Sequence, residues 1–304
     1  MALDTAKATA ILRDLTQKFD SALGEYTPFY PRICTVRPSN RRDENYGWIG
    51  ALPGVREWIG ERVFNQLAAA KYLLANKNWE DSIAIDRFDL ADDILGMYDL
   101  AFPMLGEEAA KHPDTLLFNA VINGETQACF DGQYFFSASH AWGSSGTQSN
   151  LLAATAATPT IPTSAEWKKA FTAALIKMFT YKNDKGLLMN RPVMAPTRVV
   201  ALVPPTQWQG AKEAMEAVII SNTTNINIGV CEVIPIPFLT TGTKWYLLNV
   251  DSRLRPFIFQ AREPVTRYMK GLDDREFKNV KFMTEARYNV GYLAWWNAVL
   301  TTFS

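Results

Sequence analysis

The chain has 304 residues, with 31 Lys and Arg residues balanced by 31 Asp and Glu residues, so its formal net charge is zero. This length can supply two lobes, or one lobe with extensions, around sizeable cores. A balanced charge argues against a dedicated nucleic-acid-binding protein. It still permits a protein surface that faces DNA without binding it tightly. A near-neutral surface also repels copies of itself only weakly, so it permits self-association.

Cysteine usage and hydropathy indicate the compartment. Three widely separated cysteines, Cys34, Cys129 and Cys231, predict no disulfide framework and fit a reducing cytoplasm. The N-terminal residues lack the basic start and apolar core of a secretory signal. No apolar run reaches the roughly 18 residues that span a bilayer. We therefore expect a protein that is used where it is made, or exported only within an assembly.

The N-terminal segment has apolar residues at three- and four-residue spacing from Leu3 to Leu23, which predicts an amphipathic helix. A short terminal helix is marginal alone in water, so it needs a partner surface. That surface is either its own domain or a neighbouring subunit. Residues 32–45 are polar and Arg-rich, and Pro31 and Pro38 favour an extended backbone there.

Two strand patterns follow, at Glu57–Phe64 and Tyr72–Ile85, with Asn76–Asn78 as a candidate turn. Residues 67–74 suit either a helix or a strand by propensity. The segment therefore predicts a hairpin that projects many aromatic and charged side chains.

A long helix is predicted next, because three aspartates precede an apolar-periodic segment that runs to about residue 110 and acidic residues suit a helix N-terminus. These residues are Asp89, Asp92 and Asp93. Pro103 predicts a kink or interruption. A second helical piece covers residues 114–122 and stops at Asn123–Gly124, so we expect one long, broken helix.

The central region predicts a small α/β lobe between about residues 125 and 250. Gly143–Thr163 is low-complexity and predicts a mobile loop. Ser164 then caps a helix to about Tyr181, without an acidic residue at the third helical position. Strands alternate with helices after this point. We expect strands at residues 198–203, 230–236 and 244–250, and a helix at 206–220.

β character dominates from residue 253 onward, with runs at 257–259 and 265–269, a turn at 271–274, and a long run at 280–302. The last run is too long for an ordinary strand. We expect it to be bent, broken at Gly291 or shared between two sheets.

Catalytic patterns are sparse. The chain has two histidines, His112 and His140, and the spacing between Cys129 and His140 matches no nucleophile or metal motif. Phosphate-loop, dinucleotide, hydrolase and zinc-protease motifs are absent from the sequence. The adjacent acidic pairs at 92–93 and 273–274 carry diverging side chains. We predict no catalytic, cofactor-binding or metal site.

Six arginines cluster in the N-terminal segment and hairpin, interleaved with carboxylates. They are Arg32, Arg37, Arg41, Arg42, Arg56 and Arg62. The cluster is either a solvated surface that pairs with itself or a source of ion pairs between subunits, for which the planar guanidinium is suited. Such pairs set register more than affinity.

Several short stretches carry a family resemblance through their joint order. They are Asn45–Gly50, Glu57–Trp58, Ala75–Lys77, Ile85–Arg87, Cys129–Gln133, Ser139–His140, Trp245–Leu248, Arg255–Gln260 and Asn289–Tyr292. In this order they resemble the major head subunit of Mu-like tailed bacteriophages, and the resemblance covers nearly the whole chain. Where that family commonly has a His-Pro pair, this chain has His140–Ala141.

The resemblance implies an α+β fold of the HK97-like capsid type. It implies an N-terminal arm at residues 1–36, an extended E-loop hairpin at 37–88, and an α/β axial domain at 125–251. A peripheral domain would combine the spine helix at 89–124 with the C-terminal strands at 252–304.

The resemblance also implies function and partners. The chain would form hexamers and pentamers of an icosahedral virion capsid that encloses double-stranded DNA through weak, non-specific contacts. Assembly would occur in the host bacterial cytoplasm with a separate scaffolding and protease protein, a portal protein and, in some heads, a decoration protein. No membrane or cofactor is implied.

Subunit contacts are expected from the helix, the arginine cluster and the hairpin tryptophans. The candidates are Leu15, Phe19, Arg41, Arg42, Trp48, Arg56, Trp58, Arg62 and Trp79. Two other functions remain open at this point, namely another self-assembling virion component such as a tail tube or connector, and an enzyme with an unrecognised site.

Overall fold

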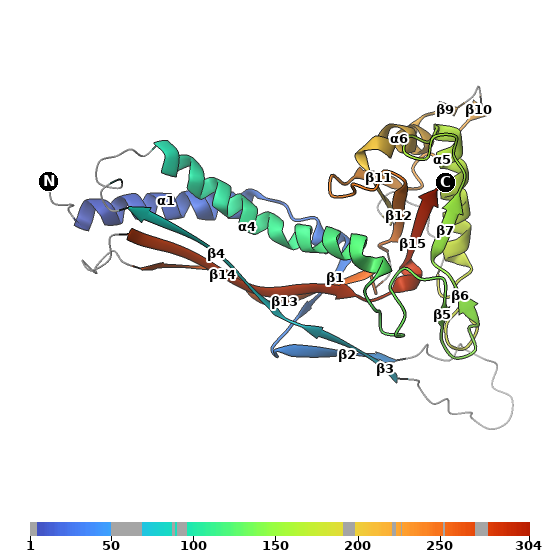
Figure 1. The fold of residues 1–304 in the computed structure, drawn as a ribbon, viewed down its shortest axis with the longest axis horizontal. Helices are drawn as coiled ribbons and strands as arrows, with labels where there is room; N and C mark the ends of the chain where they lie inside the picture. The colour runs from blue at the N-terminus through green and yellow to red at the C-terminus, as the bar shows by residue number, and fades with distance from the viewer. Residues whose placement is uncertain are drawn as a thin grey trace.

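Two β-sheets organise the chain, one in an elongated lobe and one in a compact lobe (Figure 1). The computed structural model describes residues 5–49, 69–86, 89, 96–190, 198–220, 223–225, 227–251, 253–270 and 279–304. The turn expected at 271–274, the strand expected at 57–64 and the acidic pair at 92–93 lie outside these residues.

The long lobe is built on a four-stranded sheet in the order β1-β13-β14-β4. β1 runs parallel to β13, whereas the other two pairs are antiparallel. The strands are β1 (Cys34–Pro38), β13 (Phe257–Lys270), β14 (Asn279–Tyr292) and β4 (Lys77–Asp86). Residues 257–259 and 265–269, expected as separate runs, therefore form one strand, whose register shifts between Ala261 and Thr266.

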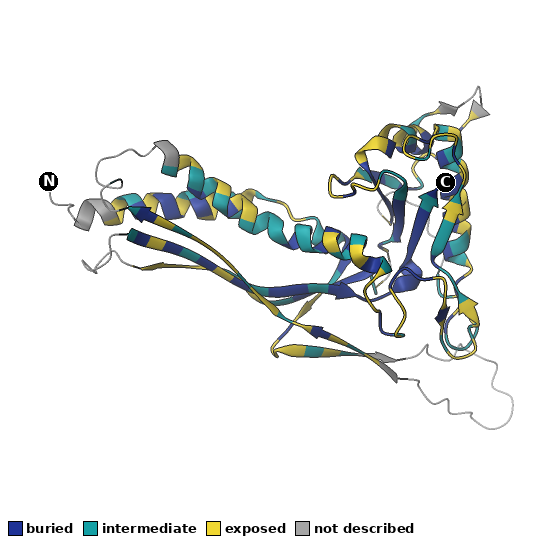
Figure 2. Cartoon of the chain, in the orientation of Figure 1, coloured by how far each residue is buried: buried dark blue, intermediate teal, exposed yellow. Residues whose placement is uncertain are grey.

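Helices α1 (Thr5–Glu25) and α4 (Gly96–Ile122) cover one face of this sheet, as Figures 1 and 2 show. Leu15 and Phe19 of α1 are each 1 % exposed and pack with residues of α4, β4 and β14. Of the two partner surfaces considered for the N-terminal helix, the structure therefore shows the first, because the helix packs on its own domain. Leu15 and Phe19 were expected to contact a neighbouring subunit. That expectation is corrected, because the chain's own core covers both side chains.

Helix α4 is one continuous element although it contains Pro103 and Pro113, so the expected break is absent. Each proline removes one helical hydrogen bond. Packing against α1 and β14 holds the turns on either side, and a Cβ at Gly106 would lie 2.4 Å from the Phe19 carbonyl oxygen, which shows how closely the helices approach. The predicted stop is confirmed, because the 3₁₀ turn η1 (Asn123–Glu125) follows directly.

The hairpin consists of β2 (Asp43–Ile49) and β3 (Ala69–Ala75), which pair antiparallel. The following strand β4 pairs with β14, so it belongs to the long sheet and the expected hairpin limit of residue 88 is too late. The hairpin is rooted where Leu74 packs with Ile258 and Leu293. The Tyr292 N–H also donates to the Tyr72 hydroxyl at 3.1 Å.

The compact lobe has a five-stranded sheet in the order β11-β8-β12-β15-β7, with its three inner strands largely buried (Figure 2). The strands are β11 (Glu232–Pro235), β8 (Val199–Val203), β12 (Lys244–Asn249), β15 (Ala298–Phe303) and β7 (Leu151–Ala154). The predicted strands near 198–203, 230–236 and 244–250 are confirmed. Because β15 lies in this sheet, residues 298–303 do not belong with the C-terminal strands of the long lobe.

Two predictions for the compact lobe are wrong. Residues 151–154 of the supposed mobile loop pair with β15 as strand β7. The helix expected over 206–220 is shorter, since η2 (Pro205–Gln207) precedes α6 (Trp208–Glu216) and Ile219–Ile220 forms β9. The remaining short strands are β5 (His140–Ala141), β6 (Thr147–Gln148) and β10 (Thr223–Thr224).

Helix α5 (Ser164–Phe179) begins one residue earlier than expected, with Thr163 as the N-cap. Thr163 Oγ1 accepts from the Glu166 N–H, and the Glu166 carboxylate accepts from the Thr163 N–H at 2.8 Å. This is a complete capping box. No acidic residue was expected at the third helical position because the predicted start of the helix was one residue too late.

A buried carboxylate anchors the segment between α1 and α2 (Tyr30–Ile33). Asp114 of α4 accepts from the Tyr26 hydroxyl at 2.7 Å and from the backbone N–H groups of Phe29 and Tyr30, the latter at 2.6 Å. A carboxylate that accepts several short hydrogen bonds is held in one position. Asp114 therefore fixes how the chain passes from the helical layer to β1.

We expect Asp114→Ala to lower the free energy of unfolding by about 3 kcal/mol, because it leaves two backbone N–H groups and a hydroxyl without their charged acceptor. Urea unfolding monitored by circular dichroism measures this change. Asp99→Ala is the control, since exposed Asp99 pairs with Lys18 on the same helix layer and such pairs contribute less than about 1 kcal/mol. Equal losses in the two variants would contradict the assignment.

We expect Gly291→Val to loosen the hairpin root, because a Cβ at this position would lie 2.8 Å from the Tyr72 hydroxyl and 2.9 Å from Leu74 Cδ2. Hydrogen exchange should become faster in β2 and β3 while the compact lobe stays protected. Gly24→Ala is the control, since its Cβ would meet no atom within 4 Å. Unchanged exchange in β3 would show that the root does not depend on this close approach.

Candidate subunit interface

The contact residues predicted from the sequence fall into four groups, one of which is the buried pair Leu15 and Phe19. Arg41 and Arg42 are exposed on the turn that leads into the hairpin, and Trp48 lies within β2. Arg56, Trp58 and Arg62 lie outside the described residues. Among the described candidates, the structure therefore brings Arg41, Arg42 and Trp48 together only as neighbours along the chain, whereas Leu15 and Phe19 lie in the core and Trp79 lies in β4.

The turn at residues 39–42 is held from both sides. The Glu44 carboxylate accepts from the Ser39 hydroxyl and from the backbone N–H groups of Asn40 and Arg41. The Asn76 side chain donates to the Arg41 carbonyl at 2.7 Å, and the Asn76 N–H donates to the Arg42 carbonyl at 2.9 Å. The backbone of this arginine pair is thus fixed, although the two side chains reach into solvent.

The arginine cluster divides by its partners. Arg32 forms an ion pair with Glu232 of β11, so it links the N-terminal segment to the compact lobe. Lys244 of β12 makes a second link to Glu125 after α4. Within the part of the chain that the structure describes, Arg41 and Arg42 form no ion pair. Arg32 thus pairs within its own chain, as the first interpretation of the cluster expects. Arg41 and Arg42 remain available for ion pairs with another subunit.

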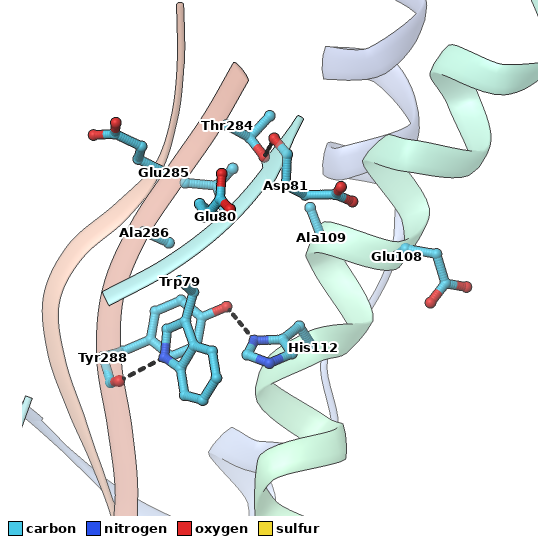
Figure 3. Close-up of a pocket in the computed structure, with 11 residues that line it drawn as sticks. Trp79, Glu80, Asp81, Glu108, Ala109, His112, Thr284, Glu285, Ala286 and Tyr288 are labelled. Atoms are coloured by element: carbon cyan, nitrogen blue, oxygen red, sulfur yellow. Dashed lines mark hydrogen bonds between the residues drawn. The ribbon is translucent and has the colours of Figure 1, made fainter. Parts of the chain in front are cut away.

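A hollow of about 260 Å³ lies between α4 and the β4–β14 face and is open to solvent (Figure 3). Trp79 forms part of its aromatic side. Its indole N–H donates to the Tyr288 carbonyl at 2.9 Å, and His112 Nδ1 lies 2.9 Å from the Tyr288 hydroxyl. Burial lowers the pKa of His112 below its ordinary value of 6.5, which favours a neutral ring at pH 7.

Sequence reasoning missed most of this hollow, because its residues come from four separate segments of the chain, which belong to β4, α4, β13 and β14. It also missed exposed apolar residues on α4, where Leu100 and Met104 are 65 % and 56 % exposed. Their four-residue spacing gives one helix face, which a periodicity argument assigns to the core. The interior is formed by another face, which includes Phe102.

The Cys129–His140 region has the geometry of a structural cluster. His140 Nδ1 lies 2.6 Å from Asp131 Oδ2, and the ring stacks on Trp295 with centroids 4.0 Å apart. Burial, with Asp131 nearby, raises the pKa of the Cys129 thiol well above its ordinary value. A nucleophilic cysteine needs the opposite shift and a base beside it.

Metal and membrane signals are also absent from the residues described. No group of three or more His, Cys, Asp or Glu side chains in these ranges could hold a metal ion. Among the same residues, no helix combines the length and the apolar character needed to cross a membrane.

Comparison with known sequences identifies related proteins. Residues 8–161 and 240–302 match the family described as Mu-like prophage major head subunit gpT. The major head subunit of the Mu-like prophage FluMu of Haemophilus influenzae is 32% identical over 285 residues, covering 92% of this chain and 68% of that protein. The major capsid protein of Escherichia phage Mu is 37% identical over 140 residues, which span 46% of each chain.

Solved structures show the fold. The procapsid subunit of bacteriophage JBD30 has a TM-score of 0.56 at 23% identity, with 97% of this chain and 74% of that chain covered. The capsid subunit of cyanophage P-SCSP1u has a TM-score of 0.60 at 12% identity, with 91% and 88% covered. A virus-like particle from Pyrococcus furiosus gives 0.56 at 11% identity, with 95% and 98% covered.

The expected α+β fold of the HK97-like capsid type is therefore confirmed. The family match includes both the long lobe and strands of the compact lobe. Together with the FluMu relative, it shows that the chain belongs to the family of Mu-like prophage major head subunits.

Proposed function

We propose that this chain is the major capsid protein of a Mu-like tailed bacteriophage, and that copies of it form the hexamers and pentamers of an icosahedral head. The observation that carries the proposal is the family match across both lobes, combined with a fold shared with capsid subunits. The tail-tube and connector alternative gains no support, since these structural relatives form capsids.

The surface of the subunit supports self-association. The chain has no net charge, so copies repel one another weakly. Leu73 on the hairpin and Leu100 on α4 are large apolar residues that are mostly exposed in the single chain. Exposed apolar groups of this kind gain free energy when a partner covers them.

The proposed role is structural and needs no catalysis. The thiol of Cys129 is buried and its pKa is raised, and the nearby His140 pairs with Asp131 instead of the thiol. This arrangement supports a packing role for the cluster.

Other partners are proposed from the family and from a structural relative. The JBD30 capsid is decorated with minor capsid protein trimers, which supports a decoration protein for this head. We further propose a separate scaffolding and protease protein, a portal protein and assembly in the host bacterial cytoplasm. As part of the same proposal, the chain has the arm, E-loop, peripheral domain and axial domain that the family resemblance implies.

The test is expression of the full chain in bacteria, alone and with its scaffolding protein, followed by size-exclusion chromatography and negative-stain microscopy. We expect closed shells of uniform diameter in at least one of the two conditions. Open tubes or rings would support the tail-tube or connector alternative. A small oligomer under both conditions would contradict a capsid role.

We expect the unassembled subunit to bind DNA weakly and without sequence preference. Salt-sensitive affinity requires several uncompensated cations near phosphates, and this chain balances its cations with carboxylates. A gel shift at near-physiological salt should show no resolvable complex. A sub-micromolar dissociation constant with a steep salt dependence would overturn this expectation.

A further inference from the structure

The hollow between α4 and the long sheet combines an aromatic side with a single sign of charge. Trp79, His112 and Tyr288 supply the aromatic groups, and Ala109 keeps the helix side small. Its lining also includes four carboxylates and no Lys or Arg. These residues are Glu80, Asp81, Glu108 and Glu285.

The carboxylates differ in what already holds them. Glu108 shares Lys111 with Glu107, at 3.7 Å and 2.5 Å respectively. Asp81 has no cationic partner among the described residues, and Figure 3 shows it extending from β4 toward α4. Glu285 points away from the hollow in the same view. The fourth carboxylate, Glu80, accepts from the Ser82 hydroxyl at 3.0 Å. Asp81 is therefore the carboxylate best placed to receive a cation from outside.

An aromatic surface beside a carboxylate fits a guanidinium group. Arginine stacks on aromatic faces through cation–π attraction, and its planar donors pair with carboxylate oxygens. Trp79 already accepts such a contact, because Lys77 Nζ lies 5.9 Å from its ring centroid.

The same chain presents a matching group at a different place. Arg41 and Arg42 form the one Arg-Arg pair in the sequence, and their backbone is fixed by Glu44 and Asn76. A cation presented on a fixed turn loses less conformational entropy on binding than one on a free loop.

The two groups face opposite directions on one subunit. In Figure 1, α4 lies above the long sheet, whereas the turn between β1 and β2 lies below it. One copy therefore cannot place its own arginine pair in its own hollow. Contact between different patches of identical copies is heterologous, and it closes into a ring when the rotation between copies permits.

We propose that the hollow is the receptor for the Arg41–Arg42 turn of a second copy of this chain, with a guanidinium held between Asp81 and the aromatic group of Trp79 and Tyr288. The inference rests on the proposed self-assembly and specifies one of its contacts. It assigns the arginine pair a partner, and it explains why an exposed part of β4 carries acidic residues next to an aromatic surface.

Site-specific cross-linking tests the contact without requiring complete shells. A tagged copy carries Asn40→Cys and an untagged copy carries Ala109→Cys, and the mixture is treated with a short bis-maleimide under assembly conditions. The native cysteines are all buried, so they should not react. We expect a tagged–untagged heterodimer on a denaturing gel. Gln209→Cys in the compact lobe replaces Ala109→Cys as the control and should give only background.

Charge reversal then identifies the paired groups. Asp81→Lys with Glu108→Lys in the receptor copy should lower the heterodimer yield about tenfold, as expected for like charges at a contact. Arg41→Glu with Arg42→Glu in the other copy should do the same, and combining the two reversals should restore the yield. The matched control, Glu213→Lys with Glu216→Lys on α6, should leave the yield unchanged.

The outcomes separate this contact from the capsid role. A heterodimer at background level, or no recovery in the combined reversal, would overturn the contact even if the wild-type chain forms shells. A charge-dependent heterodimer without shells would support the contact and count against the capsid role. Circular dichroism of each variant confirms that the four reversals, all at exposed positions, leave the fold intact.

Discussion

The C-terminal stretch of the chain supplies an inner strand to each of the two sheets, and the relation between the two lobes depends on this stretch. Residues 279–292 form β14, which pairs with β13 on one side and β4 on the other. After the 3₁₀ turn η3 (Trp295–Asn297), residues 298–303 form β15, which pairs with β12 and β7. Because both strands are paired on both edges, neither sheet can shift its register without disturbing the other.

The short turn between these strands cannot satisfy its backbone groups within a ladder, so side-chain amides do so. Asn150 donates to the Trp295 carbonyl at 3.4 Å, and Asn190 donates to the Trp296 carbonyl at 2.8 Å. Asn297 donates to the Leu254 carbonyl at 2.6 Å. Buried carbonyl groups need such partners, because an unpaired one costs about 1–3 kcal/mol. These asparagines and the His140–Trp295 stack hold the junction between the lobes.

Local patterns predicted elements whose own residues decide their structure. Strand β8 was predicted because Val199–Val203 is an apolar run bounded by Pro204, and α1 was predicted from its apolar spacing. Strand β7 was missed, since Leu151–Ala154 lies in a low-complexity segment and its pairing partner is about 150 residues away. The α5 cap was misplaced by one residue, because Thr163 and Ser164 are both good caps and only the contact with Glu166 selects between them.

The arrangement of the lobes came from the family resemblance, since no local pattern encodes it. The same division applies to the candidate interface. Arginine clustering in a polar segment was visible in the sequence. The hollow, however, requires β4, α4 and β14 to meet, and Trp79 was the one lining residue among the predicted subunit contacts. Pattern reasoning placed Phe19 on an apolar stripe correctly. It could not decide whether the chain itself or a neighbour covers that stripe, because both produce the same periodicity.

The parallel pairing of β1 with β13 has a consequence for synthesis of the chain. Residues 34–38 lie beside residues 257–261, so β1 must wait for a partner that is made more than 200 residues later. At about 5–20 residues per second, this interval is roughly 10–45 s. During that time residues 34–38 lack their pairing partner in a crowded cell, where unpaired segments of this kind can join one another. The fold thus makes chaperone protection during translation an advantage for this chain.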